Sequence, residues 1–158
     1  MNRARADRSR RLPIVVEVVM VALGLLSCSS PTTTPTSPRT QGDTMQIRIG
    51  DRTLTAKLAD NSSARALKDL LSQGPVTIAM SDYASMEKVG NLGTTLPTND
   101  EQISTAAGHL ILYQGDKFVI YYDTNSWSLT RLGWVEGVSA DELKQILGSG
   151  DVTVLELP

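Results

Sequence analysis

Five residues combine side-chain types that suit ligand binding, because aromatic rings can cover the apolar part of a ligand while an amide and a guanidinium group form hydrogen bonds with its polar part. They are Tyr83, Asn99, Tyr122, Trp127 and Arg131. Tyr121 and Tyr122 are adjacent in a predicted strand, so they face opposite sides and at most one of them lines a given pocket. The same rings can also fill the core and close its ends. The sequence leaves both interpretations open.

Other reactive groups lack the partners that catalysis or metal binding requires. His109 is the single histidine, and we interpret it as a surface or strand-end residue rather than as a base or metal ligand. The sequence holds no Gly-x-Ser-x-Gly elbow, no two-histidine metal spacing and no EF-hand loop. Gly148-Ser149-Gly150 follows a predicted helix, so it is a helix stop rather than a phosphate loop. We therefore predict no metal site and no cofactor.

Charge and cysteine content exclude further classes of function. The chain has 158 residues with a net charge of −2. Residues 45–158 carry 9 Lys+Arg against 14 Asp+Glu, a net charge of −5. A mildly acidic domain without a basic stripe is a poor candidate for nucleic-acid binding. No cysteine follows Cys28, which excludes internal disulfides and thiolate metal sites in this part of the chain.

The first 27 residues have the pattern of a secretion signal. Five arginines against one aspartate precede an apolar run over 12–26. Fifteen helical residues span only about 22 Å, short of a hydrocarbon core of roughly 30 Å. The run ends in Leu25-Leu26-Ser27-Cys28, which resembles the bacterial lipobox and implies cleavage before Cys28 and lipidation of its thiol. An ordinary cleaved signal, an uncleaved anchor, and a cytosolic form that starts at Met45 are the alternatives.

Residues 28–44 read as a tether that follows the lipidated cysteine. Ser, Thr, Pro, Gly and Gln dominate the segment after Cys28, and it contains no large apolar residue to bury. We therefore expect an exported protein of the cell envelope, held on a bacterial membrane by the lipid on Cys28. The folded domain is expected over 45–158.

That domain is predicted to be mainly β, with one helix early and one late. Apolar alternation predicts hairpins over 45–58 and 110–122, and further strands over 76–80, 128–135 and 152–157. Helical spacing of apolar residues predicts a helix over 64–71, and a Ser139–Glu142 capping box opens a second one that runs through Leu147. The polar stretch 81–107 is too long for a plain loop, so it contains short strands or has a function. About eight strands with two capping helices indicate a closed barrel.

The order of several segments resembles the bacterial cyclophilin-like domain family over essentially all of 45–158. The segments are Met45-Gln-Ile-Arg-Ile-Gly50, Leu54–Asn61, Leu96-Pro97-Thr98-Asn99, Ala107-Gly-His-Leu-Ile-Leu-Tyr113, Thr130-Arg-Leu-Gly133 and Leu147-Gly-Ser-Gly150. The resemblance implies a cyclophilin-type closed barrel of eight strands with two capping helices. It implies no settled activity.

True cyclophilins carry a Phe-x-Arg strand whose arginine stabilises the twisted prolyl amide. The corresponding stretch here, 76–83, has neither residue, so efficient prolyl isomerisation is not expected, and Arg131 could replace the missing arginine only if it faces the same concavity. We therefore expect a non-catalytic module that binds a peptide, a protein or a small molecule. A weak prolyl isomerase that uses Arg131 is the alternative, and a domain that only supports envelope assembly is a third.

Overall fold

The computed structural model describes residues 42–148 and 152–158, and these residues form nine strands and two helices. In chain order they are β1 (Thr44–Ile49), β2 (Arg52–Leu58), α1 (Ser62–Leu71), β3 (Val76–Tyr83), β4 (Glu87–Asn91), β5 (Glu101–Ser104), β6 (His109–Tyr113), β7 (Lys117–Tyr121), β8 (Ser126–Val135), α2 (Ala140–Gly148) and β9 (Val152–Glu156). The predicted signal peptide, Cys28 and the tether up to residue 41 lie outside the described residues. Within the described ranges, neither helix has the length and apolar character needed to cross a membrane.

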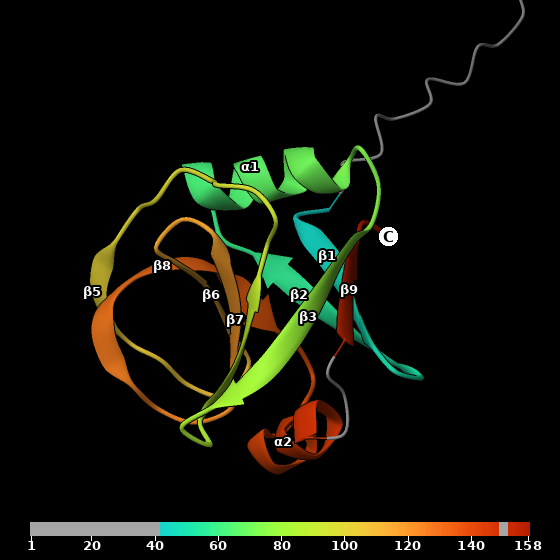
Figure 1. Cartoon of the computed structure of the whole chain (residues 1–158), viewed down its shortest axis with the longest axis vertical. Helices are drawn as coiled ribbons and strands as arrows, with labels where there is room; N and C mark the ends of the chain where they lie inside the picture. The colour runs from blue at the N-terminus through green and yellow to red at the C-terminus, as the bar shows by residue number, and fades with distance from the viewer. Residues whose placement is uncertain (1–41, 149–151) are drawn as a thin grey trace, which may run out of the picture. The chain divides into compact units, whose positions relative to one another are not determined.

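Eight of the described strands close into an antiparallel barrel, in the order β2-β1-β9-β3-β4-β7-β6-β8, and β8 pairs back onto β2 (Figure 1). The ninth strand, β5, pairs with the first half of β8. Gly133 lies where β8 meets β2. A Cβ atom at this position would stand 2.1 Å from the carbonyl oxygen of Lys57, so the barrel closes here because glycine has no side chain. The predicted closed barrel with about eight strands and two helices is confirmed.

The main core fills the barrel and continues beneath both helices. Alternate residues of β1 point inward, beginning with Met45 and Ile47, which are fully buried. The helices lie at opposite ends of the barrel (Figure 1) and each contributes one apolar face to this core. From α1 these residues are Ala64, Leu67 and Leu71, and from α2 they are Leu143, Ile146 and Leu147. Burying the apolar stripe of a helix against an open barrel end explains why two short helices are stable here.

Each helix begins directly after a capping side chain, and α1 begins at Ser62, two residues before the predicted start. Asn61 is the N-cap of α1, and its side-chain oxygen accepts a hydrogen bond from the Ala64 backbone N–H at 2.9 Å. The Ser139 hydroxyl accepts one from the Glu142 N–H at 3.2 Å, at the start of α2. Each cap satisfies an N–H group that has no partner within the helix.

More residues of the stretch 81–107 lie in β-strands than the sequence predicts. β3 continues to Tyr83, and β4 and β5 both lie within this stretch. β4 has the sequence Glu-Lys-Val-Gly-Asn, in which Val89 is the single residue of the β-branched or aromatic kind typical of strands. Gly90 faces inward because a Cβ atom there would stand 2.3 Å from Cγ2 of Ile78. β3 therefore supplies the side chains that fill the barrel at this point.

A second, smaller core lies on the outer face of the barrel. Its buried members are Ile111, Val119, Tyr121 and Leu129, with Met86, Val89 and Ile103 packed at its edge. Strands β6 and β7 are therefore buried on both faces, which explains their nearly continuous apolar sequences. This outer face of the barrel is therefore apolar, and an apolar surface of this kind can form a ligand pocket.

Candidate functional site

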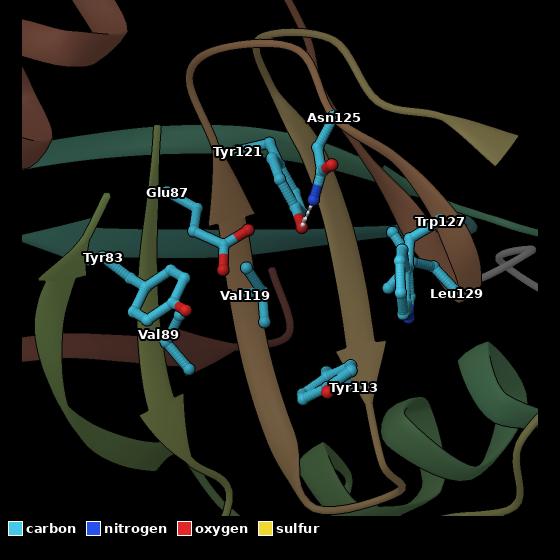
Figure 2. Close-up of a pocket in the computed structure, with 9 residues that line it drawn as sticks. All are labelled: Tyr83, Glu87, Val89, Tyr113, Val119, Tyr121, Asn125, Trp127 and Leu129. Atoms are coloured by element: carbon cyan, nitrogen blue, oxygen red, sulfur yellow. Dashed lines mark hydrogen bonds between the residues drawn. The ribbon is translucent and has the colours of Figure 1, made fainter. Parts of the chain in front are cut away.

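The candidate site is a pocket of about 330 Å³ on this outer face (Figure 2). Its lining consists of Tyr83, Glu87, Val89, Tyr113, Val119, Tyr121, Asn125, Trp127 and Leu129. Outward positions of β3, β4, β7, β6 and β8 supply all of these side chains except Asn125, which precedes β8. The volume is at the lower end of the range for small-molecule pockets, roughly 300–1,000 Å³.

Tyr83 and Trp127 form the two exposed walls. They stand on opposite sides of the pocket, with Val119 between them (Figure 2). Tyr83 is 64% exposed and Trp127 is 61% exposed. Two large rings that remain open to solvent beside a buried apolar floor leave apolar area that a ligand can cover.

Glu87 brings a carboxyl group into this apolar setting. It is paired in register with Tyr121 of β7, and its carboxyl group points toward the middle of the pocket (Figure 2). Only 9% of Glu87 is exposed, and its Oε2 atom has no hydrogen-bond partner among the described residues. Burial raises the pKa of Glu87, and hydrogen bonding with Tyr121 lowers it in part. The carboxyl group therefore has an acceptor free for a ligand.

A short polar chain positions Tyr121. The side-chain amide of Asn125 donates to the Tyr121 hydroxyl at 3.3 Å (Figure 2). Burial and hydrogen bonding with Glu87 together raise the pKa of Tyr121 to about 12. Tyr121 therefore stays protonated at neutral pH and acts as a hydrogen-bond donor toward the carboxyl group.

A second hollow, of about 270 Å³, lies farther along the outer face of β8. Its lining consists of Ala59, Asp60, Asn61, Asn99, Glu101, Ile103, Leu129, Arg131 and Trp134. Trp127, Leu129 and Arg131 are alternate residues of β8, and Leu129 lines both hollows. The Nε atom of Arg131 is buried and has no partner among the described residues.

The structure does not bring the five sequence-predicted ligand residues into one groove. Tyr83 and Trp127 line the aromatic pocket, whereas Asn99 and Arg131 line the second hollow. Tyr122 is buried in the main core, and its hydroxyl donates to the Asp82 carboxylate. The opposite orientation of Tyr121 and Tyr122 is as predicted, but Tyr121 is the one that lines the pocket.

Asn99 is also used by the fold itself. Its side-chain amide donates to the hydroxyl groups of Ser62 and Ser63 at 2.7 and 2.6 Å, and its backbone N–H donates to Thr130 Oγ1 at 2.7 Å. These contacts attach the segment before β5 to α1 and β8. Asn99 therefore has a structural role whether or not the hollow binds a ligand.

Both the sequence and the fold of this chain match known proteins. A family model described as the Cyclophilin-like family matches residues 47–155. The chain belongs to this family. Its Cyclophilin-like barrel is similar to the solution structure of a hypothetical protein from Archaeoglobus fulgidus, with a TM-score of 0.57 and 10% sequence identity. The alignment covers 77% of this chain and 99% of that one, and at this identity it shows the fold alone. No curated protein matches the chain.

His109 of this Cyclophilin-like barrel is the first residue of β6. Its Nδ1 accepts a hydrogen bond from the Ala106 backbone N–H at 3.2 Å, as expected of a residue at the start of a strand. Burial and the charge of Arg131 lower its pKa. Among the described residues, no group of three or more His, Cys, Asp or Glu side chains could hold a metal ion.

Sequence reasoning missed the lining residues of β4, β6 and β7, above all Glu87 and Tyr121, and also Asn125 and Leu129. One signal was available for β6 and β7. The runs over 109–113 and 117–122 are apolar at nearly every position rather than at alternate ones, which indicates strands that are covered on both faces. No pattern in the sequence indicated that Glu87 is buried, because a glutamate in a polar stretch is typical of a solvated surface.

Proposed function

We propose that this chain is an exported, lipid-anchored protein whose Cyclophilin-like barrel binds a peptide or a small molecule without catalysing a reaction on it. The observation that carries the binding role is the aromatic pocket. Tyr83 and Trp127 remain more than 60% exposed on either side of a buried apolar floor. Covering two such rings removes apolar area from water, which favours association.

The anchoring part of the proposal rests on the sequence of residues 1–44. The lipobox-like Leu-Leu-Ser-Cys sequence and the Ser/Thr/Pro-rich segment after it would hold the barrel near a membrane while leaving its outer wall accessible. A diacylglyceryl cysteine gives a stable anchor because more than one acyl chain is buried.

A weak prolyl isomerase is the second candidate, and the position of Arg131 favours it. Arg131 and Trp134 both line the second hollow, and this hollow shares Leu129 with the aromatic pocket. A prolyl ring held against Leu129 would thus lie two residues along β8 from Arg131, whose guanidinium group would hydrogen-bond the amide. Such a donor lowers the barrier of about 18–20 kcal/mol for amide rotation.

One NMR experiment separates the two candidates. The full-length chain, labelled with ¹⁵N and held in a non-ionic detergent, is mixed with the neutral peptide acetyl-Ala-Ala-Pro-Phe-amide. The chain has two tryptophans, so the indole N–H signal of Trp127 reports on the pocket and that of Trp134 on the second hollow. Exchange between the cis and trans peptide signals reports catalysis, because uncatalysed isomerisation takes tens of seconds or longer.

Binding that shifts the Trp127 signal without cis–trans exchange supports the binding module. Exchange that disappears in Arg131→Ala establishes the isomerase instead. If neither the peptide nor a low-mass extract of the cell envelope shifts the Trp127 signal, the proposed binding role is wrong.

A further inference from the structure

We propose that the aromatic pocket binds a protonated amine, with an ammonium N–H donating to Oε2 of Glu87 and the aromatic side chains surrounding the alkylammonium group. This inference rests on the proposed function, because it names the ligand class of the same pocket. Three observations carry it: an unpartnered carboxyl oxygen, the arrangement of the rings, and the absence of a competing cation in the described lining.

The carboxyl group of Glu87 is the first observation. It is more than nine-tenths buried, and its Oε2 has no hydrogen-bond partner among the described residues. A buried carboxylate that lacks a partner is costly, and the charge and hydrogen bond of a cation offset that cost. Tyr121 and Asn125 form a hydrogen-bonded chain on one side of Glu87. Oε2 is thus the acceptor that remains for a ligand.

The rings are the second observation. Tyr83 and Trp127 stand across the pocket from each other, and Tyr113 and Tyr121 lie between them toward opposite ends (Figure 2). The face of an aromatic ring carries partial negative charge and attracts an ammonium group, most strongly when water is excluded. Four aromatic side chains around one carboxyl group give an alkylammonium ion apolar contact and charge stabilisation together.

The sign of the charge is the third observation. None of the described residues that line the pocket is Lys, Arg or His, and Glu87 is the only acidic one. The negative charge of Glu87 is therefore not neutralised by a basic residue of the lining. An anionic ligand would meet the carboxyl group at close range, whereas a cation meets charge of the opposite sign.

The unpartnered oxygen also distinguishes between amines. A carboxylate oxygen only accepts hydrogen bonds, so an ammonium group that keeps an N–H satisfies Oε2, and a quaternary ammonium group does not. Charge-assisted hydrogen bonds of this kind are about twice as strong as neutral ones. The pocket should therefore prefer a primary, secondary or tertiary amine over its quaternary analogue.

The test is a titration of the ¹⁵N-labelled full-length chain with three probes that share a butyl chain and differ in the head group: butylammonium, butyltrimethylammonium and butan-1-ol. We expect butylammonium to shift the Trp127 indole signal to saturation and to leave the Trp134 signal in place. Butan-1-ol and butyltrimethylammonium should each bind about tenfold more weakly or worse. Equal affinity for butylammonium and either of the other two overturns the proposal.

Variants connect the affinity to Glu87. Glu87→Gln keeps the shape and removes the charge, and it should weaken butylammonium binding by about tenfold or more. Glu101→Gln is the matched control, because Glu101 lines the second hollow and its replacement should leave the affinity unchanged. If Glu87→Gln does not fold, Tyr83→Ala serves instead, because Tyr83 is 64% exposed and its replacement keeps the Trp127 indole signal as the readout; it too should weaken binding. Unchanged butylammonium affinity in a folded Glu87→Gln protein overturns the proposal.

The outcome also separates this inference from the proposed function. If the neutral peptide shifts the Trp127 signal and butylammonium does not, the amine proposal is wrong and the binding module stands. If neither probe shifts it, and the envelope extract does not either, both are wrong.

Discussion

Replacing Gly133 by alanine should prevent the barrel from closing properly. The added Cβ atom would stand 2.1 Å from the carbonyl oxygen of Lys57 and 3.1 Å from the Cα atom of Leu58. Both neighbours are backbone atoms, so no flexible side chain can move aside. Strand β8 must therefore separate from β2 by about 1 Å or more to restore ordinary contact distances.

The size of the effect follows from what this separation breaks. Backbone hydrogen bonds flank the contact, from Ala59 N–H to Leu132 at 2.8 Å and from Glu136 N–H to Thr55 at 2.9 Å. Each such bond contributes about 0.5–1.5 kcal/mol net, and overpacking adds about 1–3 kcal/mol. Gly133→Ala should thus lower the free energy of unfolding by about 2–6 kcal/mol, which corresponds to a fall in Tm of roughly 8–25 °C for a domain of this size.

Urea unfolding followed by far-UV circular dichroism measures this difference. Gly148→Ala is the matched control, because Gly148 lies in α2 and a Cβ atom there would meet nothing within 4 Å. Alanine in a helix should leave stability unchanged or raise it by up to about 1 kcal/mol. A Gly133→Ala protein within about 0.5 kcal/mol of the wild type would show that the β2–β8 closure is not as tight as described.

Three further predictions concern the pocket, a turn and the anchor. Burial raises the folded-state pKa of Glu87, so the contribution of Glu87 to stability should be greatest below the ordinary carboxyl pKa of about 4.3 and fall as the pH rises through the raised value. The advantage of Glu87→Gln in urea unfolding should accordingly grow with pH across this window, and a pH-independent difference would contradict the assignment. Ser85 has a left-handed φ of +53° between β3 and β4, so Ser85→Gly should raise the free energy of unfolding by about 0.5–1 kcal/mol; a loss of stability would contradict this. Cys28→Ser should move the protein from the membrane to the soluble fraction, and retention on the membrane would refute lipid anchoring through Cys28.

Much of the barrel could be predicted because its strands follow local rules. The first hairpin alternates apolar and polar residues around Gly50, whose φ of +57° suits a tight turn. Both helix starts carry their own capping side chains, at Asn61 and Ser139. β4 could not be predicted in the same way, because Gly90 leaves its inward space to Ile78 of β3. That packing depends on a partner strand, which a local pattern does not reveal.

The site was harder to predict because strand alternation gives two faces without saying which one is inside. Tyr121 and Tyr122 are correctly placed on opposite faces, yet the barrel buries Tyr122 in its main core and turns Tyr121 toward the pocket. Tyr83 and Trp127 do line that pocket, whereas Asn99 and Arg131 belong to the second hollow. The register between strands decides this division, and it is set by pairings between residues far apart in the sequence.

The charged groups of the two hollows differ, and this difference bears on which ligand each can hold. In the aromatic pocket the charged group is Glu87, an acceptor when ionised, whereas the second hollow brings the donor Arg131 together with the carboxyl groups of Asp60 and Glu101. A prolyl amide that twists needs a donor near its nitrogen, and within the described lining of the aromatic pocket no basic side chain supplies one. An isomerase that uses Arg131 as this donor would therefore have to hold its substrate across Leu129, with the ring in one hollow and the amide in the other. A ligand with its own N–H donor needs only the aromatic pocket, because the free acceptor and the exposed rings are already in one place.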